Sequence, residues 1–294
     1  MKGAAARAAA VMLVRASVGT ACPCDSVPGP LGALTSRDTR WGVIGSLSYL
    51  REIGTADASG RAWSSPPGVS TQRGLLDLGA AWRPRTDLEL SVGWSAALTA
   101  TSLPGVSDVG ARAGDVTSRV RWEAPVEARG AVPDAAVWAG LRAPTGGIDA
   151  SGLGAVTGLG LGAWEASLGA ALRWRLGTRV SLTTQLEGGL RFAAVGDATP
   201  GPRGSASVGV EHRWSERWAW SLAALEVLEA SSVQDGQRVP STATRRTAVL
   251  AAVGVRVTDG VRLAVHVAAD IPIDGFAQGV VTQLRTGLAV GWSR

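Results

Sequence analysis

The chain has 294 residues, of which 46% are hydrophobic and 18% charged, and it carries a formal net charge of +5 at pH 7. No run approaches the roughly 20 apolar residues that a spanning helix needs, so a membrane-spanning form has to be a closed β-barrel. The arginines are spread along the chain among Glu and Asp instead of being clustered, which argues against a nucleic-acid partner.

The first 21 residues have the pattern of an export signal. Lys2 and Arg7 precede a short apolar core, and small residues lead up to Ala21, after which we expect cleavage. Residues 22–39 then form a periplasmic N-terminal segment that can enter the barrel lumen as a plug. Residues 40–294 form the barrel itself.

Cys22 and Cys24 are the only cysteines, and their spacing can hold a metal or a strained disulfide. Two ligands do not make a zinc site, so a processed tail is the favoured interpretation. Lipidation of Cys22 stays open as an alternative, although Gly19 stands where such signals prefer Leu.

From residue 40 onwards, apolar and polar residues alternate in twelve runs, as in strands between two unlike environments. In one of them, Leu182 and Leu186 share one face, while Glu187 and Arg191 share the other. The runs are 40–51, 72–83, 86–98, 113–123, 134–143, 162–176, 179–192, 204–214, 217–229, 244–257, 260–270 and 279–293. In 217–229 the alternation slips at 225–228, where Glu226 interrupts an apolar face, and this predicts a bulge.

The connections between the runs alternate in length. Short turns such as 177–178 and 259–260 alternate with longer segments rich in Gly, Pro, Ser and Asp, such as 99–112 and 144–161. Outer-membrane barrels combine short periplasmic turns with longer extracellular loops. An even number of strands also brings both termini to the periplasmic rim.

Seven tryptophans fall where these runs begin or end on the side of the short turns. An indole prefers the lipid–water interface because its body is apolar and its N–H is polar. A soluble sandwich or lipocalin-like barrel would point its apolar face inward, and a solenoid would show an internal repeat. We therefore predict an all-β fold, a transmembrane antiparallel β-barrel of about 12 strands, with these membrane-interface residues: Trp41, Trp82, Trp122, Trp174, Trp214, Trp218 and Trp292.

The polar faces of the runs are the predicted lining of a pore whose charges set its selectivity. Alternatively, opposite charges pair across the interior and fill it, because about twelve strands lie between filled and open barrels. The predicted pore-lining residues are Arg119, Arg121, Arg142, Glu165, Arg173, Arg175, Glu187, Arg191, Arg262, His266 and Arg285.

Catalytic, metal and cofactor sites are not expected. His266 and Asp270 share a face but lie about 13 Å apart along one strand, and His212 falls on the apolar face beside Trp214, where an interfacial role is favoured. Isolated loop carboxylates such as Asp149 are expected to be solvated.

The last run, Arg285-x-Gly287-x-x-Val290-x-Trp292, resembles the C-terminal signal that the barrel-insertion machinery reads in bacterial outer-membrane proteins. The resemblance implies that this machinery is a partner. The sequence departs from the pattern because Ser293 and Arg294 follow the aromatic residue.

A second resemblance rests on Gly140-Leu141-Arg142-Ala143-Pro144-Thr145-Gly146-Gly147, followed by Gly152-Leu153-Gly154 and preceded by Gly114-Asp115-Val116. This stretch is similar to the outer-membrane barrel family named for the meta-pathway of phenol degradation, itself distantly similar to fatty-acid and aromatic-hydrocarbon transporters. The likeness covers roughly residues 110–190. It implies an outer-membrane protein, without catalytic residues to carry over, that passes small and often hydrophobic solutes.

Together these patterns predict a porin-like barrel of the bacterial outer membrane that passes small hydrophobic or anionic solutes passively. Its predicted partners are outer-membrane lipid, the insertion machinery and the solute, and its oligomeric state is left open. One alternative is a structural or adhesive barrel with a filled interior. The other is an outer-membrane hydrolase, which needs Ser, His and a carboxylate or amide at one rim, where the two histidines are poorly placed.

Overall fold

The computed structural model describes most of the predicted barrel region. The described residues are 40–57, 59–64, 68, 70–103, 105–124, 132–146, 163–192, 198–234, 236–239, 243–271, 273–274, 277–278 and 280–294. The expected export signal, the segment 22–39 with both cysteines, the loop stretch 152–154 and Asp149 lie outside them. Within the described residues, no helix is long and apolar enough to cross a membrane.

Twelve long strands form the wall of a barrel. They are β1 (Trp41–Ala56), β3 (Ser70–Arg85), β4 (Leu88–Leu103), β6 (Val116–Glu123), β7 (Asp134–Ala143), β8 (Trp164–Arg175), β9 (Val180–Phe192), β11 (Arg203–Arg213), β12 (Trp218–Glu229), β15 (Thr244–Arg256), β16 (Val261–Asp270) and β18 (Val280–Ser293). Shorter strands extend the wall or the loops: β2 (Ala62–Trp63), β5 (Val106–Ala113), β10 (Ala198–Thr199), β13 (Ser232–Gln234), β14 (Gln237–Val239) and β17 (Ala277–Gln278).

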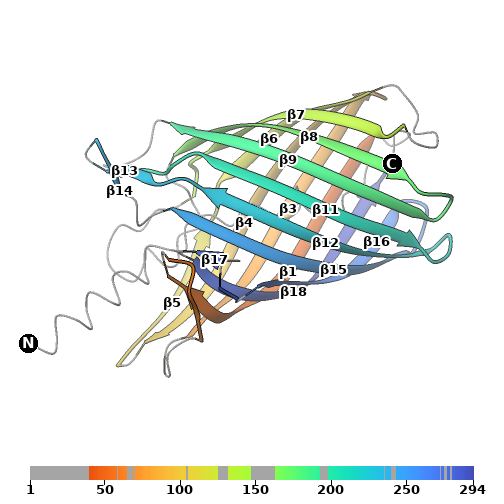
Figure 1. The fold of residues 1–294 in the computed structure, drawn as a ribbon. Helices are drawn as coiled ribbons and strands as arrows, with labels where there is room; N and C mark the ends of the chain where they lie inside the picture. The colour runs from red at the N-terminus through yellow and green to blue at the C-terminus, as the bar shows by residue number, and fades with distance from the viewer. Residues whose placement is uncertain are drawn as a thin grey trace, which may run out of the picture.

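The wall closes on itself through antiparallel pairs (Figure 1). Each long strand pairs with its neighbours along the chain, and the first strand, β1, pairs with the last, β18, from Gly42–Ser293 to Ala56–Val280. The N–H groups of Arg40 and Trp41 both donate to the carbonyl of Arg294. This closure gives hydrogen-bond partners to the backbone N–H and C=O groups of the first and last strands. A barrel that spans a membrane requires such partners, because hydrocarbon offers none.

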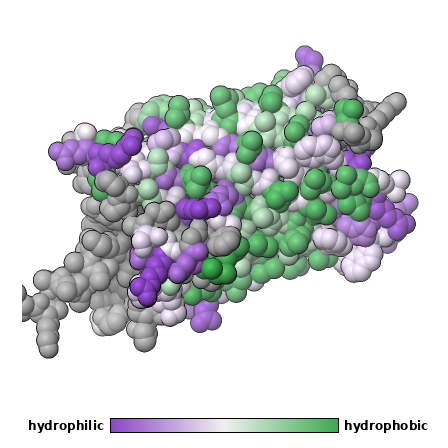
Figure 2. Space-filling model, viewed as in Figure 1, coloured by the Kyte–Doolittle hydropathy of each residue, from purple (hydrophilic) through white to green (hydrophobic). Residues whose placement is uncertain are grey.

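The outer face of the barrel is apolar over most of its height. Leu47, Leu168 and Leu186 are each more than 60% exposed although they lie well inside long strands. Figure 2 shows many apolar side chains among paler residues on the wall that faces the viewer, with strongly hydrophilic residues at the two ends and a few in the middle. Such a surface is suited to hydrocarbon, and the buried positions on the same strands point into the barrel.

The predicted runs match the observed strands to within a few residues in most places. The largest difference lies in the predicted loop 99–112, where β4 continues to Leu103 and β5 pairs back on it. Polar Thr and Ser residues there continue the ladder beyond the predicted end of the strand. The predicted loop 230–243 likewise contains the hairpin of β13 and β14.

The bulge predicted at 225–228 is wrong. The pairing of β12 runs without a shift from Arg203–Glu229 to Arg213–Ala219 on β11, and from Glu229–Thr244 to Trp218–Val255 on β15. Glu226 breaks the apolar pattern because it points outward and pairs with polar neighbours. Register shifts occur instead at Glu52/Gly54 and at Trp82/Arg85.

Candidate functional site: the charged barrel lumen

The inner face of the barrel combines small residues with an excess of arginine over acid. Strand alternation and burial show which arginine and acid side chains point into the barrel. Among the described residues, the inward arginines are Arg73, Arg83, Arg112, Arg119, Arg121, Arg142, Arg173, Arg175, Arg191, Arg203, Arg213, Arg246, Arg256, Arg262 and Arg285. The inward acids whose side chains the structure describes are Glu52, Asp77, Glu89, Glu123, Asp134, Glu165, Glu187, Glu211, Glu229 and Asp270.

A buried cluster joins β3, β1, β18 and β16 in the barrel interior. Arg285 donates from Nη2 to Asp77 Oδ2 at 2.8 Å and to Ser48 Oγ at 2.9 Å. Ser46 donates to the same Asp77 oxygen at 3.1 Å. Because barrel closure brings β1 beside both β3 and β18, residues far apart in the sequence meet here.

Ser48 also lies 3.3 Å from Nε2 of His266, so the structure brings a serine and a histidine together. The other ring nitrogen, Nδ1, is buried and has no hydrogen-bond partner among the described residues. The Ser48 hydroxyl is buried and already accepts from Arg285. This pair therefore lacks both the orienting group and the access that a nucleophilic serine needs.

A second cluster lies toward the end of the barrel opposite the short turns, between β8, β9 and β12. Arg191 bonds Glu165 at 2.9 Å through Nε, and its Nη2 group bonds Glu229. Arg142 and Arg203 act electrostatically on Glu165 as well. Among the described residues, the buried Nε of Arg203 has no hydrogen-bond partner. Three arginines thus share two acids, which leaves this part of the lumen positively charged.

Trp138 on β7 faces the lumen, and two arginine side chains lie against its ring. The guanidinium carbons of Arg119 and Arg121 lie 5.1 Å and 5.9 Å from the centre of its ring. Its Nε1 donates to Glu187 Oε2 at 2.9 Å, and the same oxygen accepts from Arg119 at 3.0 Å. The indole lies against Gly169, where an added Cβ would come within 2.3 Å of the ring. Trp138 therefore fixes the position of a cation–π pair on the inner wall.

Further ion pairs lie near the short turns. Arg83 bridges Glu89 at 2.7 Å and Glu123 at 3.1 Å with its side chain almost fully buried. On the other side of the barrel, Arg173 and Arg213 both lie within 4 Å of Glu211. The Arg83 pairs link β3 to β4 and β6, and the Arg173–Glu211 contact links β8 to β11, so these side chains tie strands together along the inner wall at this end.

The tryptophans of the predicted interface gather at this same end. Trp41 pairs with Trp82 in register, and their rings stack with centroids 5.6 Å apart. The Trp122 N–H donates to Asp87 in the turn that follows β3. Slight burial raises the pKa of Asp87, but its own backbone N–H, Arg85 and Trp122 outweigh this and lower the pKa. Six of the seven predicted interface tryptophans are exposed, and Trp174 is half-buried; their interface role stays a prediction.

Every predicted pore-lining residue lies on the inner face. Nine of the eleven belong to the clusters and ion pairs described above. The other two, Arg175 and Arg262, lie on β8 and β16. Their part in solute passage stays a prediction. Sequence reasoning missed Trp138 and Asp77, although each stands at an inward position of its run, and strand parity is the signal that could have found them.

Two segments of the resemblance motif meet in space. Asp115 accepts the backbone N–H of Gly146 at 3.0 Å. Thr145 accepts the N–H of Val116 at 2.9 Å and donates to the carbonyl of Gly114 at 3.4 Å. Gly-Asp-Val and Pro-Thr-Gly thus form one clasp, which ties the end of β7 to the start of β6. Among the described residues, no group of three or more metal-ligating side chains comes together.

Comparison with known proteins identifies a family and solved structures that this chain resembles. The sequence profile of the family described as MetA-pathway of phenol degradation matches residues 55–286. A search of curated proteins found no match. Among solved structures, an outer membrane channel from Pseudomonas putida F1 superposes with a TM-score of 0.68 at 16% identity, over 87% of this chain and 98% of that one.

Two other barrels have a lower similarity. The translocator domain of the autotransporter NalP from Neisseria meningitidis has a TM-score of 0.50 at 9% identity, over 89% of this chain and 91% of that one. The transport unit of AIDA-I from Escherichia coli also has a TM-score of 0.50, at 10% identity, over 98% and 97%. The fold is therefore that of a bacterial outer-membrane β-barrel.

Proposed function

Because the chain belongs to the family described as MetA-pathway of phenol degradation, we propose that it is a passive outer-membrane channel for small solutes that favours anions. The observation that carries this proposal is the excess of arginine on the inner wall, above all the group of Arg142, Arg191 and Arg203 around Glu165 and Glu229. A lumen with net positive charge raises the local concentration of anions and lowers that of cations.

The contacts of Arg119 with Trp138 and Glu187 support the same proposal. Trp138 and Glu187 hold the Arg119 guanidinium against the inner wall. A fixed guanidinium presents hydrogen-bond donors to a passing carboxylate or phosphate without first having to lose conformational freedom. A similar barrel from Pseudomonas putida F1 is described as an outer membrane channel, which agrees with a role in transport.

A specific observation favours a second candidate, the structural barrel with a filled interior. Many inward arginines form ion pairs with acids on adjacent strands or on the next strand but one, and several of these pairs are almost fully buried. Such pairs can bridge the interior of a barrel of intermediate width and block it. The two candidates make opposite predictions about solute entry.

Liposome swelling separates them. Purified protein is reconstituted into liposomes, which are then diluted into iso-osmotic solutions of a small neutral sugar, an organic anion and an organic cation of similar size. The channel predicts swelling in all three, fastest with the anion. Equal absence of swelling in protein-containing and protein-free liposomes supports the filled barrel and contradicts the channel.

A further inference from the structure

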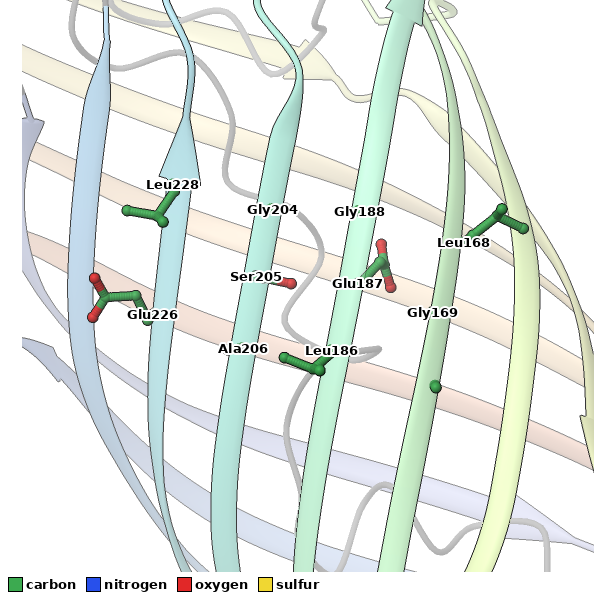
Figure 3. A pocket seen from close by; sticks show the side chains of 11 residues that line it. Leu168, Gly169, Leu186, Glu187, Gly188, Gly204, Ser205, Ala206, Glu226 and Leu228 are labelled. Atoms are coloured by element: carbon green, nitrogen blue, oxygen red, sulfur yellow. The ribbon is translucent and has the colours of Figure 1, made fainter.

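The outer wall of the barrel contains a hollow where two strands lack side chains. Gly188 on β9 and Gly204 on β11 are register partners, and both lie on the outward face of their strands. In Figure 3 the ribbons are bare at these two residues, while Leu168 and Leu228 stand on either side. The hollow has a volume of about 570 Å³. Its width therefore spans the wall from β8 to β12.

Apolar side chains border this hollow. Leu168 and Leu186 are 70% and 64% exposed, and Leu228 is 50% exposed. Ala206 adds only a methyl group beside Gly204 on the same face. A depression with these borders lies open to hydrocarbon and has room for an acyl chain.

A charged group stands at one edge of the hollow, on the same outward face. Glu226 points from β12 toward β15 (Figure 3), where its carboxylate accepts from Arg245 Nε at 2.5 Å and from Thr247 Oγ1 at 2.8 Å. Among the described residues, this is the one hydrogen bond that the Arg245 guanidinium makes. Its side chain is 45% exposed, so its terminal N–H groups are available to an outside acceptor.

The height of this group matches the outer headgroup level. Residue 228, the register partner of Arg245, follows Trp218 by ten positions on β12. Ten residues span about 33 Å of strand, or about 25 Å of membrane depth at a tilt of about 40°. The apolar band of such barrels is about 25 Å tall. With the tryptophan belt at one edge of the band, Arg245 lies at the other edge, and the glycine hollow lies just inside it.

We propose that this part of the wall is a lipid-binding site for one phosphorylated, multiply acylated glycolipid of the outer leaflet. A phosphate accepts hydrogen bonds from the free terminal groups of Arg245, and one acyl chain fills the hollow over Gly188 and Gly204. Glu226 holds the guanidinium in place and has no part in binding the anion. Charge complementarity favours this occupant, because the exposed group with unused donors is a cation beside the edge of an apolar depression.

The glycines allow the hollow to be filled without a clash. An added Cβ at Gly188 meets nothing within 4 Å, and at Gly204 it first meets the carbonyl of Glu187 at 4.0 Å. Gly204→Leu should therefore occupy the acyl site in a folded barrel. Gly74→Leu is the matched control, because Gly74 faces outward on β3 and is equally open. Arg51→Gln controls for Arg245→Gln, because Arg51 is an exposed, outward arginine on β1.

Native mass spectrometry in detergent tests the site with bisphosphorylated lipid A as the probe. Each variant is first checked for the heat-modifiable mobility of a folded barrel. We expect Arg245→Gln and Gly204→Leu each to reduce the lipid-bound fraction about fivefold, while Arg51→Gln and Gly74→Leu leave it unchanged.

Three outcomes overturn the proposal. The first is equal loss in the control variants, which indicates nonspecific adsorption. The second is equal binding of a zwitterionic phospholipid, which shows that the anion is not recognised. The third is a dimer peak that Gly204→Leu abolishes, which assigns the hollow to a second copy of the chain. None of these readouts depends on solute transport.

Discussion

The replacement of Asp77 by Asn tests the buried cluster on the inner wall. Asp77 is 3% exposed and is the carboxylate that Arg285 contacts at 2.8 Å. Asn keeps the shape of the side chain but removes its charge, so Arg285 stays buried without a counterion. Breaking a buried ion pair in this way costs about 3–5 kcal/mol. We expect Asp77→Asn to lower the free energy of unfolding by this amount.

Asp134→Asn is the matched control. Asp134 also faces inward and also pairs with an arginine, but its partner Arg175 is 58% exposed. An exposed pair contributes about 0–1 kcal/mol, so this variant should be close to the unmodified protein. The double variant Asp77→Asn/Arg285→Met removes both charges and should recover most of the loss, because a buried pair replaced as a whole is often neutral.

The assay is equilibrium unfolding in guanidinium chloride of barrels folded into lipid vesicles, followed by tryptophan fluorescence. A difference between Asp77→Asn and Asp134→Asn of less than about 1 kcal/mol would refute the reasoning. It would mean that water reaches Arg285 and replaces the lost anion. Failure of the double variant to recover stability would show that the cluster contributes through its hydrogen bonds and not through charge.

Three further predictions concern the lumen and its clasp. Gly169→Val should displace Trp138, whose ring lies 2.3 Å from the added Cβ. The free energy of unfolding should fall by about 1–3 kcal/mol in the same assay. An unchanged fluorescence maximum together with unchanged stability would contradict this prediction. Asp115→Asn should lower stability by about 1–2 kcal/mol because the hydrogen bond from Gly146 loses its charged acceptor, and a thermal midpoint equal to that of the unmodified protein would count against the clasp. Arg142→Glu changes the lumen by two charges, worth about 1 kcal/mol to a passing ion at about 8 Å in water. The anion is disfavoured and the cation favoured by about fivefold each, so the anion-to-cation permeability ratio should fall about 25-fold in bi-ionic measurements; no change would place Arg142 off the solute path.

The alternation of residues predicted the barrel well, because one physical cause acts on every strand. A side chain that meets hydrocarbon has to be apolar, and its neighbour that meets the lumen does not. In β9 this rule assigns Leu186 outward and Glu187 inward, as the structure shows. The same rule failed at Glu226, because an outward charge can persist where Arg245 and Thr247 satisfy it.

The partners within the lumen could not be predicted from the sequence. Asp77 and Arg285 are separated by 208 positions, and they meet because β1 pairs with both β3 and β18. Alternation assigns a face to each residue, but the stagger of neighbouring strands decides which residues share a height. Trp138 was missed for a related reason, since its role depends on Gly169 of β8 and on the arginines of β6.

The reversal potential of single channels under a salt gradient tests the central claim most directly. Purified protein is inserted into a planar bilayer with a tenfold gradient of potassium chloride. An open lumen with excess arginine predicts discrete conductance steps whose reversal potential has the sign of chloride selectivity. Cation selectivity, or a bilayer without steps despite folded inserted protein, would contradict the account.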